Sequence, residues 1–170
     1  MMTDFEKYVQ RYLDLIPTSN WREELKSQGQ ITLDFYQSIS EEQSLFAYAD
    51  GKWTLKELLL HLSDTERVFQ YRLLCIARGE KSELPGFDEE LYAQNSFANS
   101  RSLGTLIQEF QLIRNSTQIL VDTLESSVLQ NRGVANGNEI SAETIAQLIV
   151  GHNIHHLSII KERYLPGLKL

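Results

Sequence analysis

Apolar residues recur at intervals of three and four positions along almost the whole chain, and this spacing is the feature that most restricts its fold. Such spacing places apolar side chains on one face of an α-helix. The alternation of apolar and polar residues that is typical of β-strands is almost absent. With 42% hydrophobic residues in a length of 170, the chain can bury a core without disulfides. We therefore expect an all-α protein with a single domain, residues 1–170.

Capping and helix-breaking residues set the expected helix boundaries. Pro17 and Pro166 stop the first and last helices. The clearest start lies at Thr54, because Glu57 three positions later completes a capping box. Ser141 is the expected N-cap of the last helix. The signals together predict a short leading helix and four long ones, over about 3–16, 20–38, 54–78, 102–124 and 141–164.

Two segments between these helices have the composition of loops. Residues 79–100 contain Pro85, two glycines and several Ser and Asn residues, so we expect a long crossover with a turn of helix near 88–92. Residues 126–141 are expected to form a shorter loop. The predicted architecture is therefore a four-helix bundle with a short N-terminal helix and one long crossover.

Charge and cysteine content exclude several classes of protein. The net charge of −7 has the wrong sign for holding a nucleic-acid backbone. Cys75 is the only cysteine, which excludes an intramolecular disulfide and a thiolate metal cluster and suits a reducing compartment. The N-terminus does not resemble a signal peptide, and no apolar run approaches the ~18 residues of a membrane span. We expect a cytoplasmic protein that acts on a small molecule.

Three of the four histidines lie within five positions of the last expected helix, in the sequence GHNIHH. At about 100° per residue, His152 and His156 fall in the middle of its apolar stripe, whereas His155 lies about 80° away at the margin. The fourth, His61, lies midway along the helix 54–78 at the edge of its stripe. If these two helices are neighbours, three imidazoles can hold a metal ion and leave positions open, as catalytic zinc sites do.

Buried histidines can also be structural, with hydrogen bonds to a carbonyl or carboxylate. The apolar neighbours of His152 and His156 on their own helix offer no such partner, and leaving two imidazoles unsatisfied costs a few kcal/mol. The H-x-x-x-H spacing favours a metal. We therefore predict metal ligation by His61, His152 and His156, with His155 and Asp64 as groups that orient the ligands.

Other metal motifs and other polar residues give weaker signals. Asn153 follows His152, so the H-E-x-x-H protease motif is absent, and no Glu-x-x-His pair of the di-iron bundles occurs. Glu66 is expected on a solvated face. Arg72 and Arg163 could clamp an anionic group near the metal, but a surface position is expected for both. The aromatic residues are expected mainly in the core, and Phe87 or Tyr92 could form a wall of the site where the crossover covers an end of the bundle.

The segments GKWTLKELLLHLSDTE and GHNIHHLSII resemble the DinB/YfiT-like superfamily of metal-dependent enzymes, and the resemblance covers nearly the whole chain. It implies an up-down-down-up four-helix bundle, often dimeric, that binds nickel or zinc at positions matching His61, His152 and His156. Some members of the superfamily are S-transferases that use low-molecular-weight thiols, and others are called hydrolases. The resemblance thus implies a divalent metal, a thiol cofactor for the transferase type, and a homodimer.

The residues and the resemblance together predict an enzyme in which a divalent ion activates a thiol or a water molecule. The reaction would be S-transfer to, or hydrolysis of, a small molecule. The alternative from another class is a non-catalytic bundle that binds a metal or a small molecule.

Overall fold

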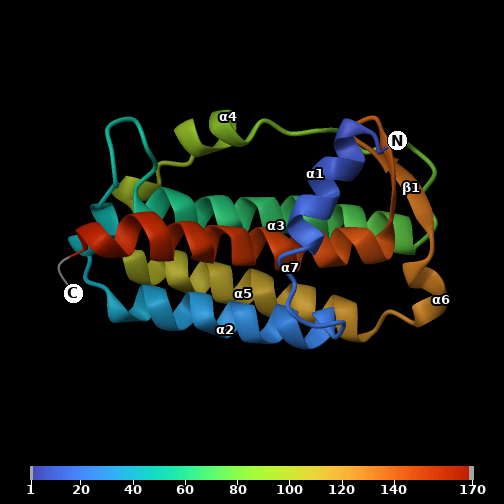
Figure 1. The fold of residues 1–170 in the computed structure, drawn as a ribbon, viewed down its shortest axis with the longest axis horizontal. Coiled ribbons are helices and arrows are strands. Elements are labelled where there is room, and N and C mark those ends of the chain that lie inside the picture. The colour runs from blue at the N-terminus through green and yellow to red at the C-terminus, as the bar shows by residue number, and fades with distance from the viewer. Residues whose placement is uncertain (1, 169–170) are drawn as a thin grey trace.

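The computed structural model describes residues 2–168, which form a bundle of four long helices with smaller elements along one side and at one end (Figure 1). The long helices are α2 (Trp21–Ser38), α3 (Leu55–Ala77), α5 (Leu103–Asp122) and α7 (Ala142–Ile159). α2 and α7 run in one direction and α3 and α5 in the other. The predicted up-down-down-up four-helix bundle is confirmed.

The smaller elements surround this frame. The short helix α1 (Asp4–Leu13) crosses α7 at an angle (Figure 1). The others are α4 (Glu89–Gln94), α6 (Ser126–Leu129), β1 (Arg132–Ala135), β2 (Asn138–Ser141), the 3-10 turns Gln43–Leu45, Ala98–Ser100 and Leu165–Gly167, and the π-helical turn Ile160–Tyr164 that extends α7. None of the helices between residues 2 and 168 combines the length and the apolar character that a membrane span requires.

The helix starts follow the predicted caps. The side chains of Thr54 and Ser141 accept hydrogen bonds from the N–H groups of the residues three positions later, and Glu57 closes the capping box on Thr54. These bonds satisfy N–H groups that have no partner within the helix. The expected starts of α3 and α7, the two helices that carry the histidines, are confirmed.

The antiparallel hairpin β1–β2 replaces the loop expected at 126–141. Its turn lies at Asn136 and Gly137, which both have positive φ angles, 49° and 73°. Asn-Gly is the preferred pair for a two-residue hairpin turn of this kind. Ala135 and Ile140 are buried and fix the hairpin against the bundle. The Asn-Gly pair was the sequence signal for this hairpin.

The crossover between α3 and α5 runs along the side of α3 and does not cover an end of the bundle as expected (Figure 1). Near its start, the backbone of Leu84 pairs with the hairpin through Val134 and Asn136. Further along, Asp88 caps α4 by accepting hydrogen bonds from two backbone N–H groups. The hairpin therefore holds the beginning of the crossover in place, and α4 lies against α3.

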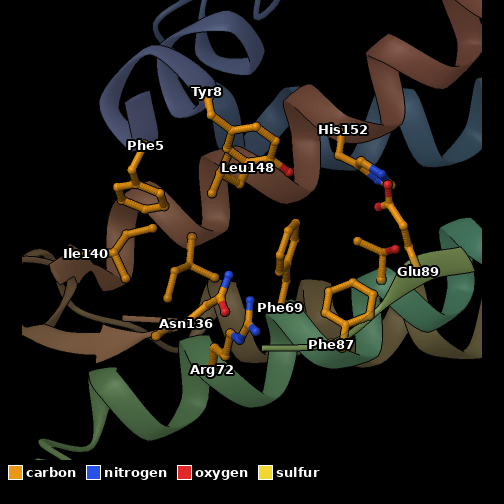
Figure 2. Close-up of a pocket in the computed structure, with 13 residues that line it drawn as sticks. Phe5, Tyr8, Phe69, Arg72, Phe87, Glu89, Asn136, Ile140, Leu148 and His152 are labelled. Carbon is orange, nitrogen blue, oxygen red and sulfur yellow. The ribbon is translucent and has the colours of Figure 1, made fainter. Parts of the chain in front are cut away.

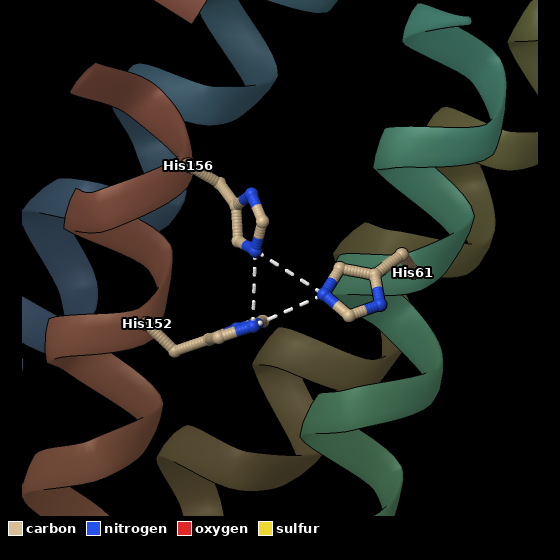
Figure 3. Close-up of side chains that lie close together, drawn as sticks. All are labelled: His61, His152 and His156. Atoms are coloured by element: carbon tan, nitrogen blue, oxygen red, sulfur yellow. Dashed lines mark hydrogen bonds between the residues drawn. The ribbon is translucent and has the colours of Figure 1, made fainter. Parts of the chain in front are cut away.

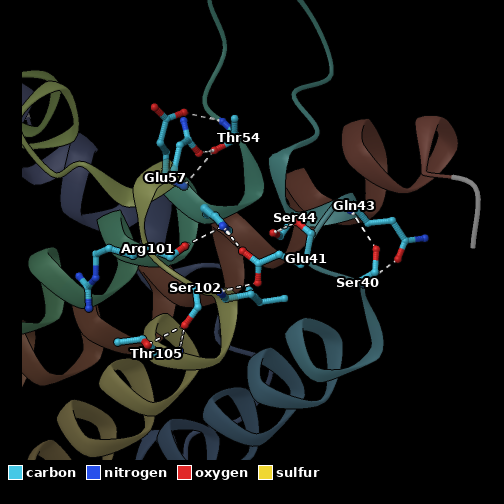
Figure 4. Close-up of polar contacts among 12 residues, drawn as sticks. Ser40, Glu41, Gln43, Ser44, Thr54, Glu57, Arg101, Ser102 and Thr105 are labelled. Atoms are coloured by element: carbon cyan, nitrogen blue, oxygen red, sulfur yellow. Dashed lines mark hydrogen bonds and ion pairs between the residues drawn. The ribbon is translucent and has the colours of Figure 1, made fainter.

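A buried lysine ties together the loop before α3 and the start of α5 (Figure 4). Lys56 is 2% exposed; its ammonium group donates hydrogen bonds to the Glu41 carboxylate and the Arg101 carbonyl oxygen. The other carboxylate oxygen of Glu41 accepts the N–H of Leu103, the first residue of α5. One ion pair thus fixes the end of the crossover to the bundle.

A polar layer divides the core into two apolar clusters, and Arg114 on α5 is at its centre. Its guanidinium donates to the Glu66 carboxylate on α3 at 2.8–3.1 Å, to the Leu25 carbonyl oxygen on α2 at 2.8 Å, and to Asn153 on α7 at 2.8 Å. Asn153 donates in turn to Thr32 on α2. Glu66 is 4% exposed, so its expected position on a solvated face was wrong.

Gly29 leaves the space that Arg114 occupies. A Cβ at this position would stand 2.9 Å from both Cγ and Nη1 of Arg114. Because the guanidinium is held by bonds to three other helices, the side chain cannot move aside without breaking some of them. Glycine lowers the stability of a helix through its conformational freedom, but the packing of Arg114 against α2 requires a glycine at position 29.

We expect Gly29→Ala to lower the free energy of unfolding by about 1–3 kcal/mol, since the overlap with Arg114 outweighs the gain in helix propensity. Gly104→Ala on α5 is the matched control, because a Cβ there meets no atom within 4 Å. It should be neutral or stabilising by up to about 1 kcal/mol. Urea unfolding followed by circular dichroism makes the comparison, and equal effects of the two substitutions would contradict this account.

Candidate metal centre

Three histidines from α3 and α7 converge inside the bundle (Figure 3). The two helices pack against each other, as predicted. The Nε2 atom of His61 lies 3.1 Å from that of His152 and 3.2 Å from that of His156, and the last two are 3.1 Å apart. All three side chains are buried. The structure therefore brings together the three residues that the sequence singled out.

The three contacts cannot all be hydrogen bonds. A hydrogen bond between two ring nitrogens needs one protonated and one bare nitrogen. Among three mutually adjacent nitrogens, at least two must be in the same state, whichever tautomers the rings adopt. At least one contact therefore brings together two N–H groups or two lone pairs. If all three nitrogens are deprotonated, one cation that binds their three lone pairs removes the repulsion between them.

The spacing of the nitrogens fits a divalent ion. Zinc binds imidazole at 2.0–2.1 Å in a tetrahedron, which separates ligand nitrogens by about 3.3 Å. The observed separations of 3.1–3.2 Å are close to this value. A set of imidazoles without thiolates or carboxylates suits zinc and nickel, among other transition metals.

The surroundings keep the rings neutral, which is the form that binds a metal. Burial lowers the pKa of His61 to about 4 and, with the nearby histidines, lowers the pKa of His156 to about 2. The pKa of His152 is also well below the usual histidine value, mainly through burial. Protons therefore compete weakly for these nitrogens at neutral pH.

Aromatic rings hold the ligands in position. The ring centre of Trp53 lies 4.7 Å from that of His61, with the two rings tilted by 43°, and the ring centre of Tyr12 on α1 lies 5.9 Å from that of His152. α1 can approach α7 this closely because residue 151 is a glycine; a Cβ there would overlap the Tyr12 carbonyl oxygen. The Nδ1 atom of His156 is buried without a hydrogen-bond partner among the described residues, so packing and not a second acceptor orients this ring.

The two residues expected to orient the ligands differ in their surroundings. His155 is half-buried, with its ring 5.1 Å from that of His156 and 5.5 Å from that of Tyr12. Asp64 forms an ion pair with Arg67 at 3.0 Å. His155 therefore adjoins the cluster, whereas the carboxylate of Asp64 is engaged by an arginine on its own helix.

A cavity of about 280 Å³ opens beside His152 (Figure 2). Its walls come from α1, the crossover, the hairpin, α3 and α7, and are largely apolar: Phe5, Phe69, Phe87, Ile140, Ile145 and Leu148. The expectation that Phe87 forms a wall is confirmed, whereas Tyr92 lines neighbouring hollows. A second cavity of about 200 Å³, lined by Trp53 and Tyr164 among others, reaches His156. Open space thus meets the cluster on two sides.

Two polar residues of the larger cavity are Thr65, for which the sequence suggested no role, and Arg72, which could clamp an anionic group but was expected at the surface. Arg72 is 8% exposed, so its expected surface position was wrong; Arg163 is exposed, as expected. The sequence did contain a signal for the buried position of Arg72. Arg72 lies eleven positions after His61 and therefore within about 20° of it around the helix. Thr65 lies one turn after His61 and is 2% exposed.

The chain belongs to the DinB superfamily, whose sequence model matches residues 24–160. A relative from Oceanobacillus iheyensis, named as a putative metal-dependent hydrolase, is 27% identical over 125 residues, which cover 73% of this chain and 72% of that protein. The structure of YfiT from Bacillus subtilis, described as a probable metal-dependent hydrolase with an unusual four-helix bundle topology, aligns with a TM-score of 0.76. The alignment covers 98% of this chain and 90% of YfiT at 18% identity.

A mycothiol-dependent maleylpyruvate isomerase of known structure aligns with a TM-score of 0.65 and 10% identity. The alignment covers 93% of this chain and 62% of the isomerase, so the isomerase has additional structure. At these identities, the two solved structures show a shared fold.

Single substitutions should separate ligands from their neighbour. We expect His152→Ala or His156→Ala to abolish stoichiometric metal binding, because two imidazoles make a poor site. His155→Ala should keep the metal, since its ring lies at the margin of the cluster. Calorimetric titration with zinc, together with circular dichroism to confirm folding, makes the test. Loss of metal in the His155 variant alone would contradict the assignment.

The lowered histidine pKa values predict how the metal-free protein responds to acid. The folded state keeps the three rings neutral, whereas the unfolded chain protonates them near pH 6.5. Histidine protonation therefore leaves the free energy of unfolding unchanged above pH 6.5. As pH falls toward 4, the unfolded chain takes up protons that the folded state does not, and the free energy of unfolding decreases by up to about 1.4 kcal/mol per pH unit for each histidine. Urea unfolding at pH 6.5, 5.5 and 4.5 should show a shallower pH dependence for His61→Leu than for the parent. Identical dependences would contradict the prediction.

Proposed function

We propose that this protein is a metal-dependent enzyme in which His61, His152 and His156 hold a divalent ion at the inner end of a substrate cavity. The observation that carries the proposal is the convergence of three Nε2 atoms within 3.2 Å of one another beside open space. A three-nitrogen set leaves coordination positions for a nucleophile and a substrate. Zinc and nickel are the ions that we propose for this site.

A bound divalent ion lowers the pKa of a coordinated water or thiol and so supplies hydroxide or thiolate at neutral pH. The protein contributes neutral ligands, an apolar cavity that limits bulk water, and a carboxylate near His152. That carboxylate belongs to Glu89, which lines the same cavity as His152 (Figure 2). Burial, followed by repulsion from Glu90 and Asp88, raises its pKa, which suits a group that accepts a proton and later returns it.

Two reactions are compatible with this site, and different observations support each. The names of the Oceanobacillus relative and of YfiT support hydrolysis, with water as the nucleophile. The second cavity beside His156 supports transfer to a low-molecular-weight thiol, because a transfer reaction needs room for two organic reactants. We propose hydrolysis as the main candidate and thiol transfer as the second. A non-catalytic binding bundle is the outcome to be tested against both.

The test is a metal-reconstitution assay on the full chain. Protein loaded with zinc or nickel should hydrolyse activated esters or amides, lose the activity on chelation and regain it when the metal is restored. His152→Ala, which should still fold, should remain inactive with added metal. A rate increase that requires a thiol, with formation of the thiol adduct, would show transfer. Fully loaded protein that shows no turnover with either nucleophile would favour the non-catalytic alternative.

A further inference from the structure

Arg72 is a buried cation that pairs with no carboxylate in the described part of the chain. Its Nη2 donates to the Pro85 carbonyl oxygen at 2.6 Å, and its guanidinium carbon lies 5.9 Å from the ring centre of Phe69 and 5.8 Å from that of Phe87. Among residues 2–168, no carboxylate lies within ion-pair distance of it. Arg114, which is buried to a similar extent, forms an ion pair with the carboxylate of Glu66. Arg72 therefore faces the cavity with capacity for an anion.

Thr65 supplies an independent sign of a ligand in the same cavity. Its hydroxyl oxygen is buried and has no hydrogen-bond partner in the described structure. Thr32 and Thr117, the other buried threonines of the long helices, donate to the carbonyl oxygen four positions earlier. Thr65 lacks this bond. A buried hydroxyl without a partner is unfavourable, so this one is suited to a polar group of a bound molecule.

The two ends of the cavity differ in charge. Arg72 lies beside Asn136 at one end, and Glu89 lies toward His152 at the other (Figure 2). Phe69 stands between them, with its ring centre 6.2 Å from that of His152. An anionic group is therefore attracted to the Arg72 end and repelled from the Glu89 end. The apolar walls between the ends suit an aromatic or aliphatic body.

We infer that the cavity binds a small monocarboxylate with an apolar body, whose carboxylate contacts Arg72 and whose polar group near the metal centre contacts Thr65. In the metal-free protein this orientation follows from the charges of Arg72 and Glu89 at the two ends. The reaction of this molecule at the three histidines rests on the proposed function, whereas its binding to Arg72 does not require a metal. The volume of about 280 Å³ limits the ligand to a small molecule.

The probe is phenylacetate, with phenylacetamide as a neutral molecule of the same shape. Calorimetry with the metal-loaded full chain should show phenylacetate binding at least about tenfold more tightly than the amide, as expected for a charge-assisted contact. The same preference should persist in the metal-free protein. Equal binding of the two molecules to the parent protein would overturn the inference without the need for any variant.

Arg72→Met keeps the apolar stem against Phe69 and Phe87 but removes the charge, and should weaken phenylacetate binding about tenfold or more while leaving phenylacetamide binding unchanged. Arg163→Met removes an exposed arginine and is the matched control, with parent-like binding expected. If phenylacetate binds only with metal present, and equally to parent and Arg72→Met, the metal is the anchor. The inference would then be wrong while the proposed function stands. Phenylacetate binding to Arg72 by a metal-loaded protein that fails the hydrolysis and thiol-transfer assays above would sustain the inference and contradict the function.

Discussion

The hydrogen bonds of one guanidinium group, that of Arg114, determine how the four long helices fit together. The group joins α5 to α3 through Glu66, to α2 through Leu25 and to α7 through Asn153. Removing one partner of a buried ion pair leaves an uncompensated charge and costs about 3–5 kcal/mol. Because Asn153 directly follows His152, the bond from Arg114 also fixes the position of α7 opposite His61. The placement of the histidine cluster therefore depends on the Arg114–Glu66 ion pair.

This arrangement explains how three imidazoles remain buried and neutral without hydrogen-bonded partners for all their nitrogens. Apolar clusters lie on both sides of the polar layer, and the three histidine side chains are buried between the helices, which reduces their contact with water. Exclusion of water disfavours the charged form of histidine, so the rings keep their lone pairs at neutral pH. The same dry surroundings strengthen the attraction between the rings and a cation. The packing of the core thus keeps the three histidines in the neutral form that can bind a metal.

Much of the fold could be predicted from local patterns, because helix caps and apolar spacing act within a few residues. Thr54 and Ser141 marked the starts of the two histidine-bearing helices, and helical geometry separated His152 and His156 from His155. The positions of Glu66 and Arg72 were predicted wrongly, because the burial of a charged side chain depends on what lies opposite it on another helix. Glu66 is buried because Arg114 lies opposite, and a single sequence does not show which helices face each other. The hairpin was missed although its Asn-Gly turn was visible.

The larger cavity is walled mostly by parts of the chain that are not needed to build the bundle. Phe5 and Tyr8 come from α1, Phe87 from the crossover, and Asn136 and Ile140 from the hairpin region. The histidines, in contrast, stand on two helices that the core holds rigidly. The walls, and with them the shape and polarity of the cavity, can therefore change in evolution while the three-histidine cluster is kept. Relatives with the same three histidines and different walls are expected to have diverged in what they act on more than in how they act.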